Sequence, residues 1–458
     1  MKRILAFMLT VAFAMGLATG ATAMEINVKG DFHYAFVWND NPDFSTEPHD
    51  TFWARSRVRI TTEFIASENL KGVLHLSTKL IYWGNEEGGG PAPGGGGQLD
   101  TTKAELNVHQ AYIDWTVPDT GLNVKMGLQY LFLPMAVSLS PVMNTAVAGV
   151  NVTNQFNDNV SASLGWFRPW NGSAVKDAWD MFVVTVPMQF DSFSITPWGE
   201  YSFLGRDLSL DGGSPFGGMA WEKKSKMWHA GIAASGNITD DLSIKADFIY
   251  GALTNSGDGM ETSGYFADLK IAYDLGMGKL GLALWYASGD DKNDAQKNEY
   301  GSMPSFTRSP IHEIGWGLGV SSFGFWGDNP ICYAGAVSQS GVGTMGLSLM
   351  IEELSFIENL SHDIRFLYYT GTNDHKAMTD GRALRGGGYA GNITGGFAYL
   401  LDKDDLFEIN FDHKYQISRG FTATLNFGYV WADWYKESQR SYTANNMWRC
   451  TLGFQYAF

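Results

Sequence analysis

Three arginines at alternate positions, Arg55, Arg57 and Arg59, are the most concentrated set of charged side chains in the sequence. Most of the residues that alternate with this set are apolar, namely Phe52, Ala54, Val58, Ile60 and Phe64. A β-strand over 51–64 would therefore place the arginines on one face and the apolar side chains on the other, because strand side chains alternate in direction. The guanidinium face must meet water, where a row of such groups attracts anions.

Further charged residues share this face or lie on nearby strands. They are Glu63, His75, Lys79 and Lys125. Two interpretations follow from the residue types. The first is a basic lining of a water-filled interior. The second is that Asp31, Glu63 or Glu105 neutralises the arginines, which then only brace neighbouring strands.

The last twelve residues indicate what kind of sheet positions these side chains. From Met447 to Phe458, aromatic and apolar residues occupy every second position, with Phe454, Tyr456 and Phe458 at the end. A strand that is apolar on one face, polar on the other and rich in terminal aromatics is typical of a transmembrane β-barrel. In that setting an arginine facing lipid near the midplane would cost about 2–4 kcal/mol, so the arginine face is predicted to line the lumen.

Composition agrees with a barrel in a membrane. Only 17% of residues are charged, 14% are aromatic and 54 are glycine. Beyond residue 23 no apolar stretch reaches the roughly 18 residues of a membrane helix. Residues 1–23 have the charged start, apolar centre and small-residue end of a secretory signal peptide. The net charge of −16 argues against a nucleic-acid partner.

Short turns alternate with long connections along the whole chain. The predicted turns are 67–72, 118–121, 157–159, 190–192, 239–241, 275–278, 358–361 and 418–420. The predicted long connections are 39–50, 84–103, 131–147, 170–178, 204–226, 253–261, 289–343, 371–403 and 435–445. Together they join eighteen strands; sixteen remains open, because 311–322 and 397–401 are ambiguous. We therefore predict an all-β, antiparallel barrel domain over 24–458, with short periplasmic turns and long extracellular loops.

Several segments resemble a known family. Ile26–Gly30, Ala66–Val73, Ala111–Trp115, Lys125–Gln129 and Asn157–Asn159 are similar to the outer-membrane homotrimeric porins of sulfate-reducing, Desulfovibrio-type bacteria. The resemblance covers most of the chain after residue 23. It implies a homotrimer in the Gram-negative outer membrane, in contact with lipid and lipopolysaccharide. It also implies that the barrel assembly machinery reads Phe454, Tyr456 and Phe458 as an insertion signal.

The resemblance further implies that the third long connection, 131–147, bends inward as a constriction. Its candidate residues are Leu131, Pro134, Met135, Pro141 and Asn144. General porins place acidic residues in this loop, but here it contains no carboxylate. Two interpretations stay open: a hydrophobic constriction, or a loop simply packed on the inner wall.

Other patterns do not predict a catalytic, cofactor or metal site. Asp290, Asp291 and Asp294 lack the bidentate glutamate that a calcium loop needs, although loose cation bridging to lipopolysaccharide is compatible with them. Cys332 and Cys450 are predicted to be unpaired. His413 lies on the outward register, but no serine partner for a hydrolase is identifiable.

The predicted function is therefore a porin for passive diffusion of small hydrophilic solutes and ions, without enzyme activity. The alternative is a channel specific for a sugar or an anion. That alternative is favoured by eighteen strands and by an aromatic track inside the barrel, for which the candidates are Trp53, Tyr82, Trp83 and Trp115. An outer-membrane enzyme is a distant third.

Overall fold

The computed structural model describes residues 24–40, 51–78, 80–84, 97, 99, 105–137, 139–171, 178–205, 224–255, 261–291, 299–304, 343–376, 400–436 and 446–458. The proposed signal peptide, Lys79, Cys332 and 311–322 lie outside these residues. The strands are β1 Glu25–Asp40, β2 Thr51–Ser67, β3 Leu70–Thr78, β4 Ile81–Tyr82, β5 Leu106–Thr116, β6 Leu122–Phe132, β7 Asn144–Asn157, β8 Val160–Trp170, β9 Trp179–Thr185, β10 Met188–Gln189, β11 Phe193–Leu204, β12 Ser225–Asn237, β13 Leu242–Asn255, β14 Glu261–Asp274, β15 Lys279–Ala287, β16 Glu299–Tyr300, β17 Thr344–Ile357, β18 Leu360–Gly371, β19 Asp405–Ser418, β20 Phe421–Asp433 and β21 Asn446–Ala457.

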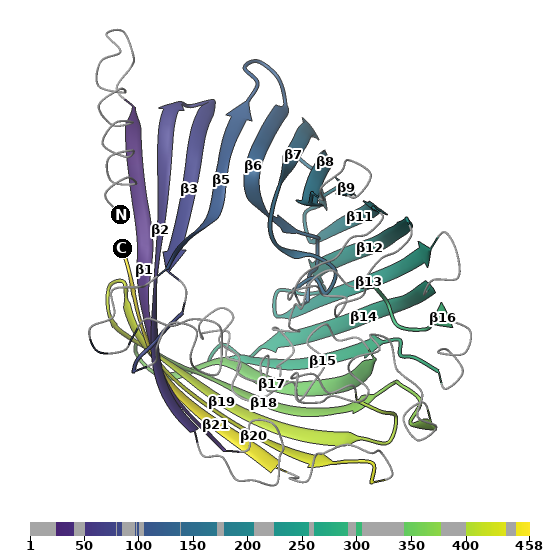
Figure 1. Ribbon diagram of the computed structural model, residues 1–458. Helices are drawn as coiled ribbons and strands as arrows, with labels where there is room; N and C mark the ends of the chain where they lie inside the picture. Colours follow the sequence, from purple (N-terminus) through teal and green to yellow (C-terminus); the bar gives the residue numbers. More distant parts are fainter. Residues whose placement is uncertain are drawn as a thin grey trace.

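The strands form one closed, antiparallel barrel. Each long strand pairs with its neighbours in the sequence, and β1 pairs with both β2 and β21, so that the first and last strands lie side by side (Figure 1). The short β4 and β10 continue the passes of β3 and β9, while β16 adds a parallel pairing to β14. Eighteen passes remain around the ring in the described chain. The predicted eighteen-stranded all-β barrel is confirmed.

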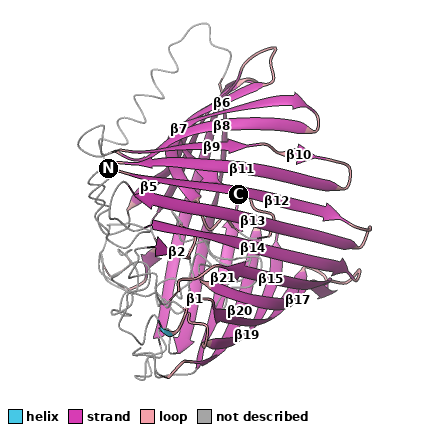
Figure 2. Cartoon of the chain, turned by 90° about the vertical axis from the view of Figure 1, so that its right-hand side faces the viewer, coloured by secondary structure: helices cyan, strands magenta, loops and turns pink. Residues whose placement is uncertain are grey.

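All eight predicted short turns join consecutive passes of the barrel. Four of them use the left-handed backbone region, where Gly, Asn and Asp are tolerated best. The residues are Asp119, Gly276, Asn359 and Gly420, with φ of 59°, 79°, 63° and 76°. Because the strands are antiparallel, the short turns gather at one end of the barrel, here named the turn end. The long connections gather at the other end, named the loop end. Figure 2 shows that strands make up most of the described chain.

The two faces of the strands differ in the way the sequence predicts. In β17, Leu347 and Leu349 are 36% and 50% exposed on the outer face, whereas Ser348 and Met350 on the inner face are 0% and 1% exposed. Large apolar side chains exposed in this way are unusual for a water-soluble sheet, whose solvent-facing side is polar. An outer surface of this kind is stable against hydrocarbon rather than water.

Exposed aromatic side chains border the apolar band near both ends of the barrel. At the turn end they are Phe156, Phe190, Phe193, Tyr273, Phe356, Tyr415, Tyr456 and Phe458; at the loop end they are Trp38, Phe52, Trp166, Phe182, Phe203, Tyr286, Phe407 and Trp431. Aromatic girdles of this kind mark the two lipid–water boundaries of a membrane barrel. Among the described residues, no helix has the length and apolar character needed to cross a membrane.

Phe458 is tied to the first strand. Its N–H donates to the carbonyl of Gly30 at 3.0 Å, and the Gly30 N–H donates to the Phe458 carbonyl at the same distance. Its ring centroid lies 6.0 Å from that of Phe32. The predicted signal residues Tyr456 and Phe458 are therefore on the outer face at the barrel seam, and Phe454 shares their register.

Candidate functional site

The connection between β6 and β7 enters the barrel interior. It runs over 133–143, slightly shorter than the predicted 131–147, with Leu131 and Asn144 inside the flanking strands. Ala136 and Val137 donate their backbone N–H groups to the two carboxylate oxygens of Asp247, each at 2.7 Å. Because Asp247 lies on the inner face of β13, this contact places the tip of the connection well inside the lumen.

β13 lies across the barrel from the arginine strand. In the ring of eighteen passes, eight lie between β2 and β13 on either side. A connection anchored on β13 therefore leaves the remaining passage towards β1, β2 and β3. The candidate constriction residues lie in and beside this connection. Asp247, which anchors its tip, is more than 100 positions away in the sequence.

Most of the connection packs into the apolar cluster that fills the opposite half of the interior. Leu133, Val137, Val142 and Met143 are at most 2% exposed and join this cluster, as does the flanking Leu131. Pro141 and Asn144 are also buried. The side chains with partial exposure are Pro134, Met135, Ala136 and Leu139, and none of them is charged. The connection therefore enters the lumen and also packs on the inner wall. A hydrophobic constriction and a wall-packed loop are both compatible with this arrangement.

Arg59 is the most accessible of the three arginines and is paired. Its Nε and Nη2 donate to the two oxygens of Asp31 at 2.8 and 2.7 Å, and Nη2 also contacts His33 Nε2 at 3.1 Å. The Arg59 side chain retains 25% exposure and that of Asp31 17%. This contact is the kind that the bracing interpretation describes, because a bidentate carboxylate offsets the charge of Arg59 while both groups stay in reach of water.

Arg55 and Arg57 lie on the same inner face but are more enclosed. Arg55 is 1% exposed, and its Nη1 donates to the Tyr82 hydroxyl at 3.3 Å, with the guanidinium carbon 5.9 Å from that ring. Arg57 is 9% exposed and lies opposite His33 in the strand register. Of the predicted ladder, Arg59 thus keeps partial exposure and Arg57 is buried on the inner face, whereas Arg55 is covered by the loop-end segment that carries Tyr82.

The remaining predicted lining residues occupy the same wall. Glu63 forms ion pairs with Lys29 at 3.6 Å and with Lys71 at 3.9 Å. His75 Nδ1 contacts Thr61 Oγ1 at 2.7 Å, and Lys125 lies 5.0 Å from the centre of the Tyr112 ring. The wall from β1 to β6 therefore carries more basic than acidic groups.

Sequence analysis did not identify His109 as a neighbour of this wall. Its ring centroid lies 5.8 Å from that of His75. The strands β3 and β5 shift register between His75 and Leu76, which turns His109 towards the arginine side. A bulge of this kind has no clear signal in the sequence.

Several buried charges on β14, β17, β18 and β19 are held in ion pairs. Arg365 Nη1 lies 2.9 Å from Asp412 and Nη2 3.2 Å from Asp363, while Lys270 Nζ lies 2.8 Å from Glu352. All five side chains are at most 12% exposed. Buried pairs of this kind contribute little field to a distant ion, because each cation has a carboxylate in contact.

A second segment narrows the loop end of this half. The carbonyl of Pro304 accepts from His229 Nε2 at 2.8 Å, and His229 Nδ1 lies 2.8 Å from Glu200 Oε2. The N–H of Ser302 donates to Asp290 at 2.9 Å. Asp290 thus has a structural contact on this segment, and none of its described contacts involves the carboxylate of Asp291.

The turn end of the interior is polar and open. A recess of about 290 Å³ lies between β11, β12 and β13, and its lining includes Ser194, Ser235, Ser243 and Lys245. This recess therefore lies across the barrel from the arginine strand and is lined mainly by small hydroxyl groups and amides.

Solved structures of other proteins share this fold. No protein-family model and no curated protein sequence matches the chain. Among solved structures, it matches OccAB4 of Acinetobacter baumannii with a TM-score of 0.54 and 11% identity over 94% of this chain and 98% of that chain. It matches the outer membrane protein OprD of Pseudomonas aeruginosa with a TM-score of 0.51 and 12% identity over 94% of each. The chain has the fold of OprD. Sequence identities this low show a shared fold, but they do not show which solute this chain transports.

The predicted aromatic track does not form. Trp83 packs edge-on against Phe36 on the outer face, with centroids 5.5 Å apart, and Trp115 is 39% exposed on the outward register of β5. Only Trp53 and Tyr82 lie inside. These four candidates therefore do not meet the condition that would favour the solute-specific alternative.

Two further sequence predictions concern the outer face. Cys450 is a free thiol on the outward register of β21. His413 also points outward, as predicted, and its partner is His362, with Nδ1 atoms 2.7 Å apart. Its described contacts thus include no serine.

Proposed function

We propose that this protein is a porin of the Gram-negative outer membrane, through which small hydrophilic solutes and ions diffuse passively. The observation that carries the proposal is the inward connection 133–143, anchored across an eighteen-stranded barrel and facing a basic wall. A barrel this wide encloses an aqueous interior unless it is plugged. A loop that narrows one side restricts solute size and brings ions close to Arg57 and Arg59.

Single-channel recording tests this function. Purified protein in a planar bilayer is expected to conduct ions in discrete steps, without saturable block by sugars or small organic anions. Saturable block at submillimolar to millimolar solute would favour the alternative, a channel specific for that solute. An absence of any conductance would refute both versions.

A solute-specific channel remains the second candidate because Arg57, Arg59, His33, His75 and His109 form one compact basic wall. A passage with these groups on one side and apolar loop residues on the other suits an organic anion with a hydrocarbon part. The missing aromatic track argues against a sugar.

We further propose that residues 1–23 are a signal peptide and that 24–458 assemble as a homotrimer. The trimer and the insertion role of Phe454, Tyr456 and Phe458 rest on the resemblance to the porins of sulfate-reducing bacteria. Contacts with lipid and lipopolysaccharide are supported by the apolar outer band and its aromatic borders.

The orientation proposed for the barrel places the turn end in the periplasm. Asp158, in the turn between β7 and β8, is then expected to be hidden from membrane-impermeant reagents in intact cells, and Gly94 to be accessible. An Asp158→Cys variant should remain unlabelled until the outer membrane is permeabilised, whereas Gly94→Cys should be labelled at once. Both tests need a Cys332→Ser and Cys450→Ser background, and immediate labelling at Asp158→Cys would contradict the orientation.

A further inference from the structure

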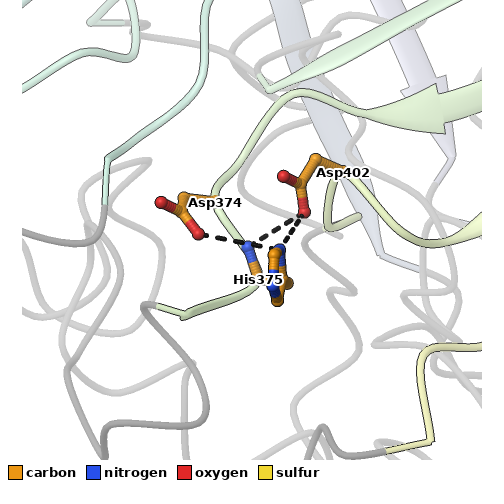
Figure 3. Close-up of side chains that lie close together, drawn as sticks. All are labelled: Asp374, His375 and Asp402. Atoms are coloured by element: carbon orange, nitrogen blue, oxygen red, sulfur yellow. Dashed lines mark hydrogen bonds and ion pairs between the residues drawn. The ribbon is translucent and has the colours of Figure 1, made fainter.

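A cluster of metal-ligating side chains lies at the loop end, apart from the passage wall. Asp374, His375 and Asp402 offer three ligand atoms that all lie within 4.8 Å of one another (Figure 3). His375 Nδ1 is 2.8 Å from Asp402 Oδ1 and 3.7 Å from Asp374 Oδ1. Asp374 and His375 begin the connection from β18 to β19, and Asp402 is near its end. The cluster therefore closes the neck of this connection.

We propose that Asp374, His375 and Asp402 bind a divalent transition-metal ion of the zinc class. Bonds of about 2.0–2.2 Å in tetrahedral geometry separate ligand atoms by about 3.3 Å. The distances from His375 Nδ1 to the two carboxylates lie on either side of this value. The three ligand atoms lie within 4.8 Å of one another, so binding requires carboxylate rotations that lengthen the His375–Asp402 contact and draw the other ligand atoms together.

The ligand types select the class of metal. Calcium and magnesium prefer all-oxygen sites, whereas an imidazole nitrogen with carboxylates suits zinc and its neighbours. Two carboxylates and a neutral imidazole give the site a charge opposite to that of the ion. Asp402 and Asp374 side chains are 43% and 26% exposed, so an ion can enter and complete its coordination with water.

The backbone holds the ligands in place independently of an ion. Asp402 N donates to the Asn373 carbonyl at 2.8 Å, and Asp374 N donates to the Asp290 carbonyl at 2.9 Å. The fully buried Asn373 donates from Nδ2 to the Leu400 carbonyl at 2.8 Å. The His375 ring also packs edge-on to Tyr435, with centroids 5.1 Å apart. The two sides of the neck are therefore fixed before any ion binds, which lowers the entropic cost of assembling the site.

Without an ion, the carboxylates of the cluster would act only as hydrogen-bond acceptors for nearby backbone N–H groups. His375 N donates to Asp402 Oδ1 at 3.0 Å, and Lys376 N donates to Asp374 Oδ1 at 2.8 Å. The carboxylates would then serve only as caps for the backbone of the neck. The two roles differ in what they predict for zinc binding and for cobalt spectra.

The test uses the full chain, purified in detergent and stripped with EDTA, and titrates it with Zn²⁺ against a chromophoric chelator. The wild type is expected to bind one ion. His375→Ala and Asp402→Asn are expected to weaken binding by at least about tenfold, since even an outer-shell partner is worth about 10–100-fold. Co²⁺ should give a visible tetrahedral spectrum in the wild type that His375→Ala lacks.

Matched controls separate this site from others. His362→Asn removes a paired histidine on the outer face, and Asp241→Asn removes an exposed carboxylate in a turn; both should bind zinc like the wild type. Heat-modifiable mobility in gels reports folding for every variant, and Asp402→Asn is the conservative change if His375→Ala folds poorly. Unchanged affinity in both site variants, or a loss confined to His362→Asn, would overturn the proposal and leave the cluster as a backbone cap.

Discussion

Replacing Arg57 and Arg59 together with serine is expected to shift the ion preference of the channel from anions towards cations. The two guanidinium groups lie on the inner face of β2, and the 133–143 connection carries no charge. A unit charge about 7 Å from an ion contributes about 2.4 kcal/mol at an effective dielectric of 20. Screening over a Debye length of about 8 Å reduces this to about 1 kcal/mol, or about fivefold in permeability ratio.

A substitution at Asp31 should shift ion selectivity in the opposite direction. Asp31 holds Arg59 through two hydrogen bonds at 2.8 and 2.7 Å. Asp31→Asn removes the offsetting charge and keeps the shape, so it should increase anion preference while the double serine variant decreases it. Arg55→Ser serves as the third comparison, because the enclosed Arg55 is expected to change selectivity less and stability more.

The measurement is the reversal potential of single channels in a KCl gradient, repeated at low and high salt. Opposite shifts for the double serine variant and Asp31→Asn, both fading as salt rises, are the expected result. Identical reversal potentials in all variants would mean that the arginines are neutralised by their neighbours. The bracing interpretation would then hold for the whole ladder.

The sequence predicts the barrel well because its signals are local. The alternation of apolar and polar residues and the Asn, Asp and Gly residues of the turns act within ten positions, and each is repeated many times along the chain. The inward face of Arg55, Arg57 and Arg59 follows from the same alternation. The alternation could not give the direction of Trp83, because this residue lies beyond the end of a regular strand.

The contacts across the lumen are not predictable in this way. Asp247 meets the 133–143 connection because the barrel closes, and no local pattern marks that carboxylate as an anchor. The same holds for Asp402, which reaches His375 across a long connection. The absence of acids in 131–147 is nonetheless a weak signal: backbone N–H groups in a lumen need acceptors, and the wall must supply them.

Asp247→Ala is expected to release the tip of the 133–143 connection and make the channel noisier and more conductive. The buried carboxylate accepts two amide hydrogen bonds at 2.7 Å, and bonds to a charged group contribute about 1.5–3 kcal/mol each. Alanine removes both and leaves the N–H groups of Ala136 and Val137 without this acceptor. Asp247→Asn keeps one carbonyl oxygen and should have a smaller effect.

Single-channel conductance and its open-state noise measure the release. Asp114→Asn is the matched control, since it alters an inner-face carboxylate that accepts from Asn123 at 2.7 Å and not from the connection. A quiet channel of wild-type conductance in Asp247→Ala would show that apolar packing alone fixes the connection. Val137 and Met143 have at most 2% exposure, so that packing holds the stem in either case. The carboxylate matters for the tip because Ala136, which it binds, is only partly buried and has a single methyl group to pack.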